Sequence, residues 1–187
     1  MRIGGFSEQT GERCPAGVQI GTLVALYDVG IQVGFEGKHQ PKVVLWWESQ
    51  HKDTKGRPFT LPDMVTNSSD ERSRMASRYG ALTGAAPTEK ECEDGWDMDP
   101  LLGRACFLLV APPKKQGGWP FISNVMPLPA GMTAPPALGV EGGTIPKFVE
   151  MMRAKAVHPG EVATPPPANV ASPAVKSAEQ IDSSIPF

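Results

Sequence analysis

Residues 70–84, DERSRMASRYGALTG, carry a helical pattern inside a segment that otherwise indicates β-strands. Apolar side chains recur at the spacing of one helix face, and Ser69 or Asp70 can cap the first turn. Gly84 can end the helix, because glycine adopts the left-handed conformation that follows many helices. We therefore expect one helix in this part of the chain.

Strand patterns lie on both sides of this helix, three before it and two after it. They are rich in β-branched and aromatic residues and are bounded by turn-forming residues. The expected strands lie within 18–33, 42–49, 55–69, 104–113 and 119–129. A helix between the third and fourth strands of a five-stranded Greek-key barrel is the plan of the OB-fold. The sequence predicts a mostly β protein of this type, although the order of elements leaves other small α+β domains open.

Composition divides the chain of 187 residues into three parts. Residues 1–17 are polar and Gly-rich, and we expect a flexible N-terminal segment. Residues 18–132 are expected to form the barrel domain. Residues 133–187 are rich in Pro and Ala and bury little apolar surface, so we expect a mostly disordered C-terminal tail. Within this tail, a helical pattern that begins with a proline predicts a short helix over 145–157.

The formal net charge is −2, from 18 basic and 20 acidic residues, and acids cluster between Glu89 and Asp99. We expect this acidic segment to be a solvated loop, or a surface that keeps nucleic acid on the opposite side. No apolar stretch is long enough to cross a membrane, and the N-terminus lacks a signal pattern. Cys14, Cys92 and Cys106 are an odd number without a CxxC pair, which argues against a disulfide framework or a zinc site. The sequence predicts a cytoplasmic protein with free thiols.

Motifs of catalysis and cofactor binding are absent from the sequence. It holds no GxSxG, P-loop or GxGxxG pattern, and its histidines lack the spacing of metal ligands. We therefore predict no enzyme activity, no cofactor and no metal. The acidic segment leaves one enzymatic alternative open, a metal-dependent nuclease that would use Asp97 and Asp99.

Aromatic side chains alternate with basic residues in two predicted hairpins, a combination that binds single-stranded nucleic acid by stacking and by phosphate contacts. The predicted stacking residues are Trp46, Phe59, Trp119 and Phe121. The predicted phosphate contacts are Lys42, Lys52, Lys55, Arg57, Lys114 and Lys115. Trp46 and Trp47 are adjacent on a strand and point to opposite faces, so their roles can be exchanged. Packing in the core is the alternative for each aromatic residue.

The chain ends in DSSIPF, residues 182–187. This end resembles the C-terminal tip of bacterial single-stranded DNA-binding proteins, in which an acidic run precedes Ile-Pro-Phe. Two serines stand here in places where those tips carry aspartates. The resemblance implies that Asp182, Ile185, Pro186 and Phe187 bind partner proteins. In this mode of recognition an apolar terminal side chain enters a pocket while basic groups hold the carboxylate.

Five further motifs resemble those of small phage-encoded OB-fold single-stranded DNA-binding proteins: YDVG (27–30), LWWE (45–48), KGRPF (55–59), LLG (101–103) followed by Cys106, and PLPAGM (127–132). The resemblance implies a protein that coats single-stranded DNA during phage replication, recombination or repair, in the cytoplasm of the host cell. It implies replication and recombination proteins as partners of the tip and no membrane partner, and it leaves a homo-oligomer open. The alternative is an OB-like protein-interaction module that does not bind DNA.

Overall fold

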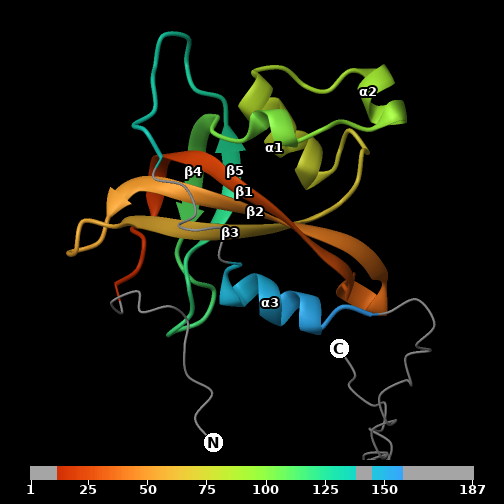
Figure 1. Cartoon of the computed structure of the whole chain (residues 1–187), viewed down its shortest axis with the longest axis horizontal. Coiled ribbons are helices and arrows are strands. Elements are labelled where there is room, and N and C mark those ends of the chain that lie inside the picture. Colours follow the sequence, from red (N-terminus) through yellow and green to blue (C-terminus); the bar gives the residue numbers. More distant parts are fainter. Residues whose placement is uncertain (1–11, 138–144, 158–187) are drawn as a thin grey trace, which may run out of the picture.

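The computed structural model describes residues 12–137 and 145–157. Its main element is a five-stranded sheet in which neighbouring strands are antiparallel. The strands are β1 (Gly17–Val33), β2 (His39–Lys52), β3 (Pro58–Thr66), β4 (Ala105–Ala111) and β5 (Phe121–Met126). Their order across the sheet is β3-β2-β1-β4-β5 (Figure 1). The prediction of a mostly β protein with five strands is confirmed.

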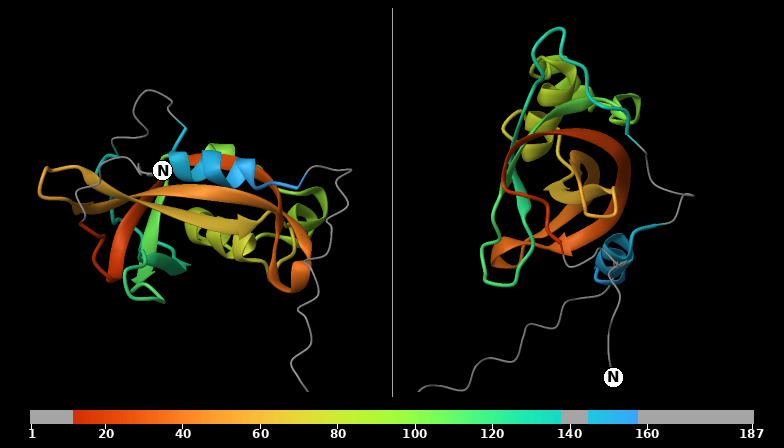
Figure 2. Two further views of the ribbon diagram at one scale, coloured as in Figure 1. Left: turned by 90° about the horizontal axis from the view of Figure 1, so that it is seen from below. Right: turned by 90° about the vertical axis from the view of Figure 1, so that its left-hand side faces the viewer.

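The sheet is strongly curved because β1 is long and irregular. One end of β1 pairs with β4 and most of its length pairs with β2, so β1 belongs to both halves of the sheet. Its register against β2 shifts between Leu23 and Ala25 and again between Asp28 and Ile31, where Gly30 has a φ of 71°. Irregularities of this kind bend a strand and increase its twist. Consequently β3 and β5, the outermost strands, contact each other, and the strands curve round a common core (Figure 2).

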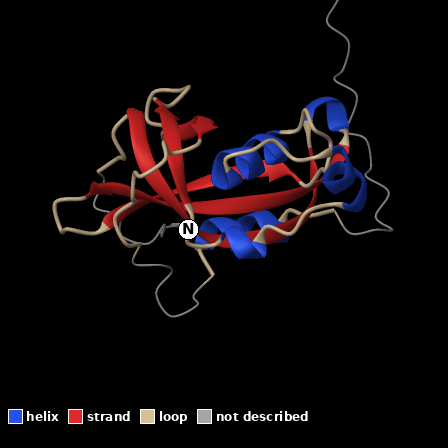
Figure 3. Cartoon of the chain, turned by 90° about the horizontal axis from the view of Figure 1, so that it is seen from above, coloured by secondary structure: helices blue, strands red, loops and turns tan. Residues whose placement is uncertain are grey.

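Five helical elements complete the described chain. They are η1 (Phe35–Gly37), α1 (Arg74–Thr83), α2 (Glu89–Asp94), η2 (Asp99–Leu101) and α3 (Lys147–Ala154). Helix α1 follows β3 and packs against β3, β4 and β5. Helix α3 contacts β1 from outside the curved sheet, so the sheet separates α3 from α1 and α2 (Figure 3).

Helix α1 is capped by Ser73 and not by Ser69 or Asp70, so the predicted cap is wrong. The Ser73 hydroxyl accepts a hydrogen bond from the Ala76 amide at 3.0 Å. The Asp70 carboxylate instead accepts a hydrogen bond at 2.7 Å from the amide two residues further on, which forms a turn before the helix. Gly84 ends the helix as predicted, with a φ of 83°.

The acidic segment contains helix α2, a helix that the sequence did not predict. Thr88 and Glu91 form a capping box, in which each side chain accepts a hydrogen bond from the other residue's amide. The Tyr79 hydroxyl also donates a hydrogen bond to Glu91 at 2.6 Å, and this bond is the largest cause of the lowered pKa of Glu91. Tyr79 stacks on Trp96 at 5.2 Å. The acidic segment is therefore tied to α1.

Alternation along β2 separates the two adjacent tryptophans. Trp47 is fully buried inside the curved sheet together with Leu23, Leu45 and Leu108. Trp46 lies on the outer face, in a second apolar cluster to which α3 contributes. Of the two tryptophans, only Trp46 is within reach of a ligand.

The predicted tail lies partly within the described residues. Helix α3 falls inside the predicted range 145–157, and it packs on the sheet although it lies beyond the predicted end of the domain at residue 132. The tip, residues 182–187, lies outside the described residues, as do residues 1–11. In the ranges 12–137 and 145–157, no helix has the length and apolar character needed to cross a membrane.

Candidate nucleic-acid interface

An apolar groove of about 380 Å³ lies beside α3 and is lined by residues from both faces of β3. Residues from β2, β3, the segment before β5 and α3 line it, together with a residue from the segment before β1. Its aromatic lining consists of Trp46, Phe59, Trp119 and Phe148, and we call it the aromatic groove. Three of the four predicted stacking residues, which are far apart in the sequence, therefore share one site.

Trp46 contributes to the groove from β2 and is held in place by its neighbours. It lies opposite Pro62 in the ladder between β2 and β3. Its ring meets the edge of the Tyr27 ring, with the centroids 6.3 Å apart, and packs against residues of α3. Trp46 is therefore a fixed, half-buried part of the groove.

Phe59 and Trp119 differ in how much of their rings a ligand can reach. Phe59 is buried and belongs to the main core as well as to the groove lining. Trp119 precedes β5 and is 48% exposed. A base that enters the groove can therefore cover much more of Trp119 than of Phe59.

Two cations lie over aromatic rings near the segment that leads into β5. The Arg13 guanidinium lies 5.9 Å from the centre of the Trp119 ring, and it donates a hydrogen bond to the Gly117 carbonyl at 3.0 Å. The Lys114 ammonium lies 5.1 Å from the centre of the Phe121 ring. Such contacts are favourable because an aromatic face carries partial negative charge. Phe121 is not among the residues that line the groove, so the fourth predicted stacking residue lies apart from the other three.

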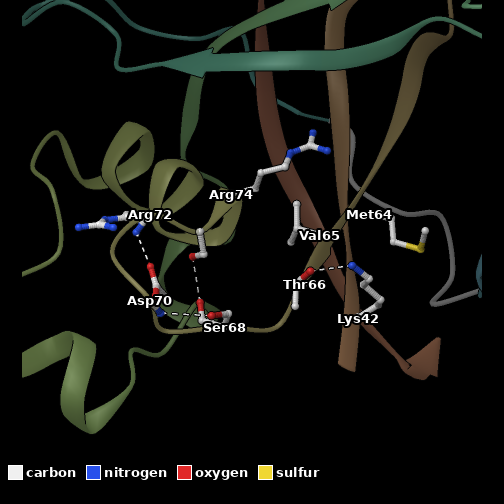
Figure 4. A pocket seen from close by; sticks show the side chains of 9 residues that line it. Lys42, Met64, Val65, Thr66, Ser68, Asp70, Arg72 and Arg74 are labelled. Atoms are coloured by element: carbon white, nitrogen blue, oxygen red, sulfur yellow. Dashed lines mark hydrogen bonds between the residues drawn. The ribbon is translucent and has the colours of Figure 1, made fainter. Parts of the chain in front are cut away.

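Lys42 lies in a different pocket, of about 350 Å³, together with Arg72 and Arg74 (Figure 4). Its ammonium donates hydrogen bonds to Thr66 at 2.6 Å and to Gln40 at 2.8 Å. Burial lowers the pKa of Lys42, and the nearby charge of Arg74 lowers it further. The Arg74 guanidinium points away from Lys42, toward β5 (Figure 4). Lys42 is therefore a cation outside the aromatic groove.

The remaining predicted phosphate contacts lie in loops at the ends of strands. In the turn between β2 and β3, the Asp53 carboxylate accepts hydrogen bonds from the Arg57 side chain at 2.9 and 3.0 Å. Burial raises the pKa of Asp53, but the hydrogen bonds and charge of Arg57 outweigh it and hold this pKa below its usual value. Lys52 and Lys55 are exposed beside this ion pair, and Lys115 is exposed in the loop between β4 and β5. The positive charge of Arg57 is therefore partly neutralised by the Asp53 carboxylate.

Some residues of the site were not predicted from the sequence. Lys147, Phe148 and Met151 reach the groove from α3, and Arg13 reaches Trp119 from the segment before β1. The helical spacing of Phe148 and Met151 indicated a helix, but it carried no information about the surface that this helix covers. The contact of Arg13 with Trp119 could not be predicted, because a single basic residue in a polar segment forms no pattern that indicates a binding site.

The thiol nearest the groove is poorly suited to chemistry. Burial raises the pKa of the Cys14 thiol. The side-chain amide nitrogen of Gln19 donates a hydrogen bond to the Cys14 sulfur at 3.3 Å. Ser49 donates a hydrogen bond to the side-chain oxygen of the same glutamine. A thiol with a raised pKa is protonated at neutral pH and is a weak nucleophile.

Among the described residues, no three His, Cys, Asp or Glu side chains gather as a metal site would require. The arrangement of the groove is suited to binding flat apolar groups.

No protein family, curated protein or solved structure matches this chain. The class of ligand is therefore inferred from the groove and its surroundings.

Proposed function

We propose that the protein is a non-catalytic single-stranded DNA-binding protein and that the bases of the DNA strand bind in the aromatic groove. The observation that carries this proposal is the convergence of Trp46, Phe59 and Trp119 in one groove. Aromatic faces beside cations bind bases of any sequence, and each stacked base contributes about 1–3 kcal/mol. Arg13 and Lys147 supply cations at this groove.

We also propose that the curved sheet is an OB-fold Greek-key barrel. Helix α1 lies between β3 and β4 in the chain, β1 pairs with both β2 and β4, and β3 contacts β5. This is the arrangement expected of a five-stranded, partly open barrel, whose β2–β3 face and adjoining loops bind oligonucleotides. The aromatic groove is lined by Trp46 of β2 and by residues 59–62 of β3.

The proposed roles of the tip and the biological setting rest on sequence resemblance. Ile185, Pro186 and Phe187, preceded by Asp182, would recruit replication or recombination proteins. The setting would be phage DNA replication, recombination or repair in the cytoplasm of a host cell. A chain that holds partners at its end while its groove holds DNA would bring enzymes to the bound strand.

Tryptophan fluorescence with a dT oligonucleotide tests the DNA-binding proposal. We expect quenching, and an affinity that falls more than tenfold when salt rises from about 50 to 200 mM, because bound phosphates release counterions. A duplex of equal length should not compete. Trp119→Ala should weaken binding about tenfold. Trp119→Phe keeps an aromatic face, so its affinity for dT should change little while the fluorescence quenching becomes smaller. Equal affinity for duplex and single strand would refute the proposal.

The apolar lining of the groove favours one alternative function. Lys147 is the one charged residue among the described residues that line it, so an apolar peptide would also fit this surface. A protein-interaction module of this kind would cause no salt-sensitive quenching by dT. The fluorescence titration therefore separates the two functions.

A further inference from the structure

Helix α3 supplies a large part of the aromatic groove although it lies outside the predicted barrel domain. Phe148 and Met151 line the groove, and Met151 is 38% exposed. Between them in the sequence, Val149 is fully buried against β1 and β2 in the outer apolar cluster. One face of α3 is thus fixed on the sheet while a neighbouring face borders the groove.

Polar contacts hold the end of α3 on β1. The Gln32 side chain donates a hydrogen bond to the Met152 carbonyl, and the Arg153 guanidinium donates one to the Asp28 carbonyl, each at 2.8 Å. The Val157 amide donates to a carbonyl of β1 at 2.8 Å. Because each bond joins α3, or the residues just after it, to a fixed position on β1, the three bonds set where α3 lies beside the groove.

The charge at the α3 side of the groove is positive. Lys147 lines the groove and is exposed. On the side of Trp119, the Arg13 guanidinium lies over the ring. The groove thus offers an apolar interior with a cation on each of two sides, which complements a base attached to a charged backbone. Its volume of about 380 Å³ lies near the lower end of the range, roughly 300–1,000 Å³, of small-molecule sites.

We propose that α3 is part of the strand-binding site. One unstacked base of a single strand occupies the groove against Trp119 on one side and Phe148 and Met151 on the other, and Lys147 contacts a neighbouring phosphate. This inference rests on the proposed function and assigns binding residues to the C-terminal part of the chain. The binding unit therefore extends beyond residue 132 and includes α3.

The lysine assignment is tested by the salt dependence of dT binding to the full chain. Removing one phosphate contact to a single strand makes the negative slope of log K against log salt shallower by about 0.7. Lys147→Gln should show this change. Lys155→Gln removes the same charge from an exposed position that follows α3 and does not line the groove, so its slope should equal that of the parent.

The base assignment is tested by placing a negative charge at the groove. Met151→Glu should weaken dT binding at least tenfold, since an acid there repels the strand and removes an apolar contact. Ala154→Glu adds the same charge to the same helix at an exposed position outside the groove and should change affinity less than twofold. Both positions are exposed, so neither variant buries a charge.

Photocrosslinking gives a readout that does not depend on a variant. A dT oligonucleotide that carries one 5-bromodeoxyuridine should crosslink to the peptide that contains Phe148 and Met151, and to the peptide that contains Trp119. Mass spectrometry of the digested complex identifies both peptides.

The outcomes separate this inference from the proposed function. If dT binds with salt-sensitive quenching but no crosslink reaches α3, and Lys147→Gln and Met151→Glu bind like the parent, the role of α3 is refuted and the proposed function stands. If Ala154→Glu and Lys155→Gln weaken binding as much as their groove counterparts, α3 contributes only general charge and its site assignment is refuted. If the parent does not bind dT, both proposals fail.

Discussion

Asp63 joins two arginines where β3 meets the core. Its carboxylate accepts hydrogen bonds from Arg78 at 2.8 Å and from Arg74 at 3.0 Å. Asp63 and Arg78 are almost completely buried, whereas the Arg74 side chain is half exposed. Removing one partner of a buried ion pair is costly because the other charge stays in the core without compensation.

Asp63→Asn should therefore lower the free energy of unfolding by about 3–5 kcal/mol. Arg74→Gln removes an exposed partner of the same carboxylate and should cost about 1 kcal/mol or less. Urea denaturation followed by circular dichroism measures both values. Similar losses of unfolding free energy in Asp63→Asn and Arg74→Gln would contradict the view that Arg78 is the partner of Asp63 that contributes most to stability.

Cys106 predicts a pH dependence of stability. Burial raises the pKa of its thiol to about 12, from a usual value of 9.0. Above pH 9 the unfolded chain loses this proton while the folded chain keeps it. The contribution of the thiol to the free energy of unfolding is therefore fully present below pH 9 and is lost between pH 9 and 12. The loss is about 1.4 kcal/mol for each pH unit in that window.

Comparison with Cys106→Ala isolates this effect from the other groups that titrate at high pH. The parent should lose stability more steeply than Cys106→Ala between pH 9 and pH 11 in urea denaturation. Parallel curves for the two proteins would mean that the thiol titrates alike in the folded and unfolded chains.

Among the elements, α3 is distinct because its contacts lie outside the main core. Val149 is the buried side chain of α3 and packs with Val29 and Val44 in the outer cluster. Val149→Asp should release α3 from the sheet, because a charged group cannot remain in this apolar contact without a partner. The five strands should stay folded, since the main core contains no residue of α3.

Hydrogen exchange measures this release directly. In Val149→Asp, amides of α3 should exchange much faster than in the parent, and amides of β1 to β5 should keep their protection. Glu150→Gln changes a neighbouring exposed residue and should leave α3 protected. Loss of protection throughout the sheet would show that α3 is essential to the fold of the described chain.

Among the described residues, the acidic helix α2 and helix α3 lie on opposite sides of the sheet (Figure 1). Helix α1 lies beside α2 on one side, whereas α3, which borders the aromatic groove, lies on the other (Figure 1). A bound strand is therefore expected to contact cations near the groove, including Lys114 and Lys115 in the loop before β5, and to avoid α2.

Replacing both Lys114 and Lys115 by Gln should make the negative slope of log K against log salt for dT shallower by about 1.4, which is twice the value for one contact. Lys90→Gln removes a lysine from α2 and should leave the slope unchanged. An equal effect of both changes would indicate that only net charge matters for binding.

Several features of this protein follow from the sequence alone. The β-branched and aromatic patterns determine the five strands, because side chains alternate between the faces of a strand. The same alternation separates Trp46 from Trp47. The helical spacing before Gly84 locates α1 and its end. Its start was misplaced, because Ser73 and Asp70 are both capable of capping and only the path of the chain after β3 selects between them.

The site itself is decided by tertiary structure. The curvature of the sheet brings Trp46, Phe59 and Trp119 to one groove, and the docking of α3 adds Phe148. Phe121, two residues from Trp119, begins β5 and does not line the groove. Local patterns determine which face of an element is apolar. Which two faces meet depends on contacts between residues far apart in the sequence, and these contacts form only when the whole chain folds.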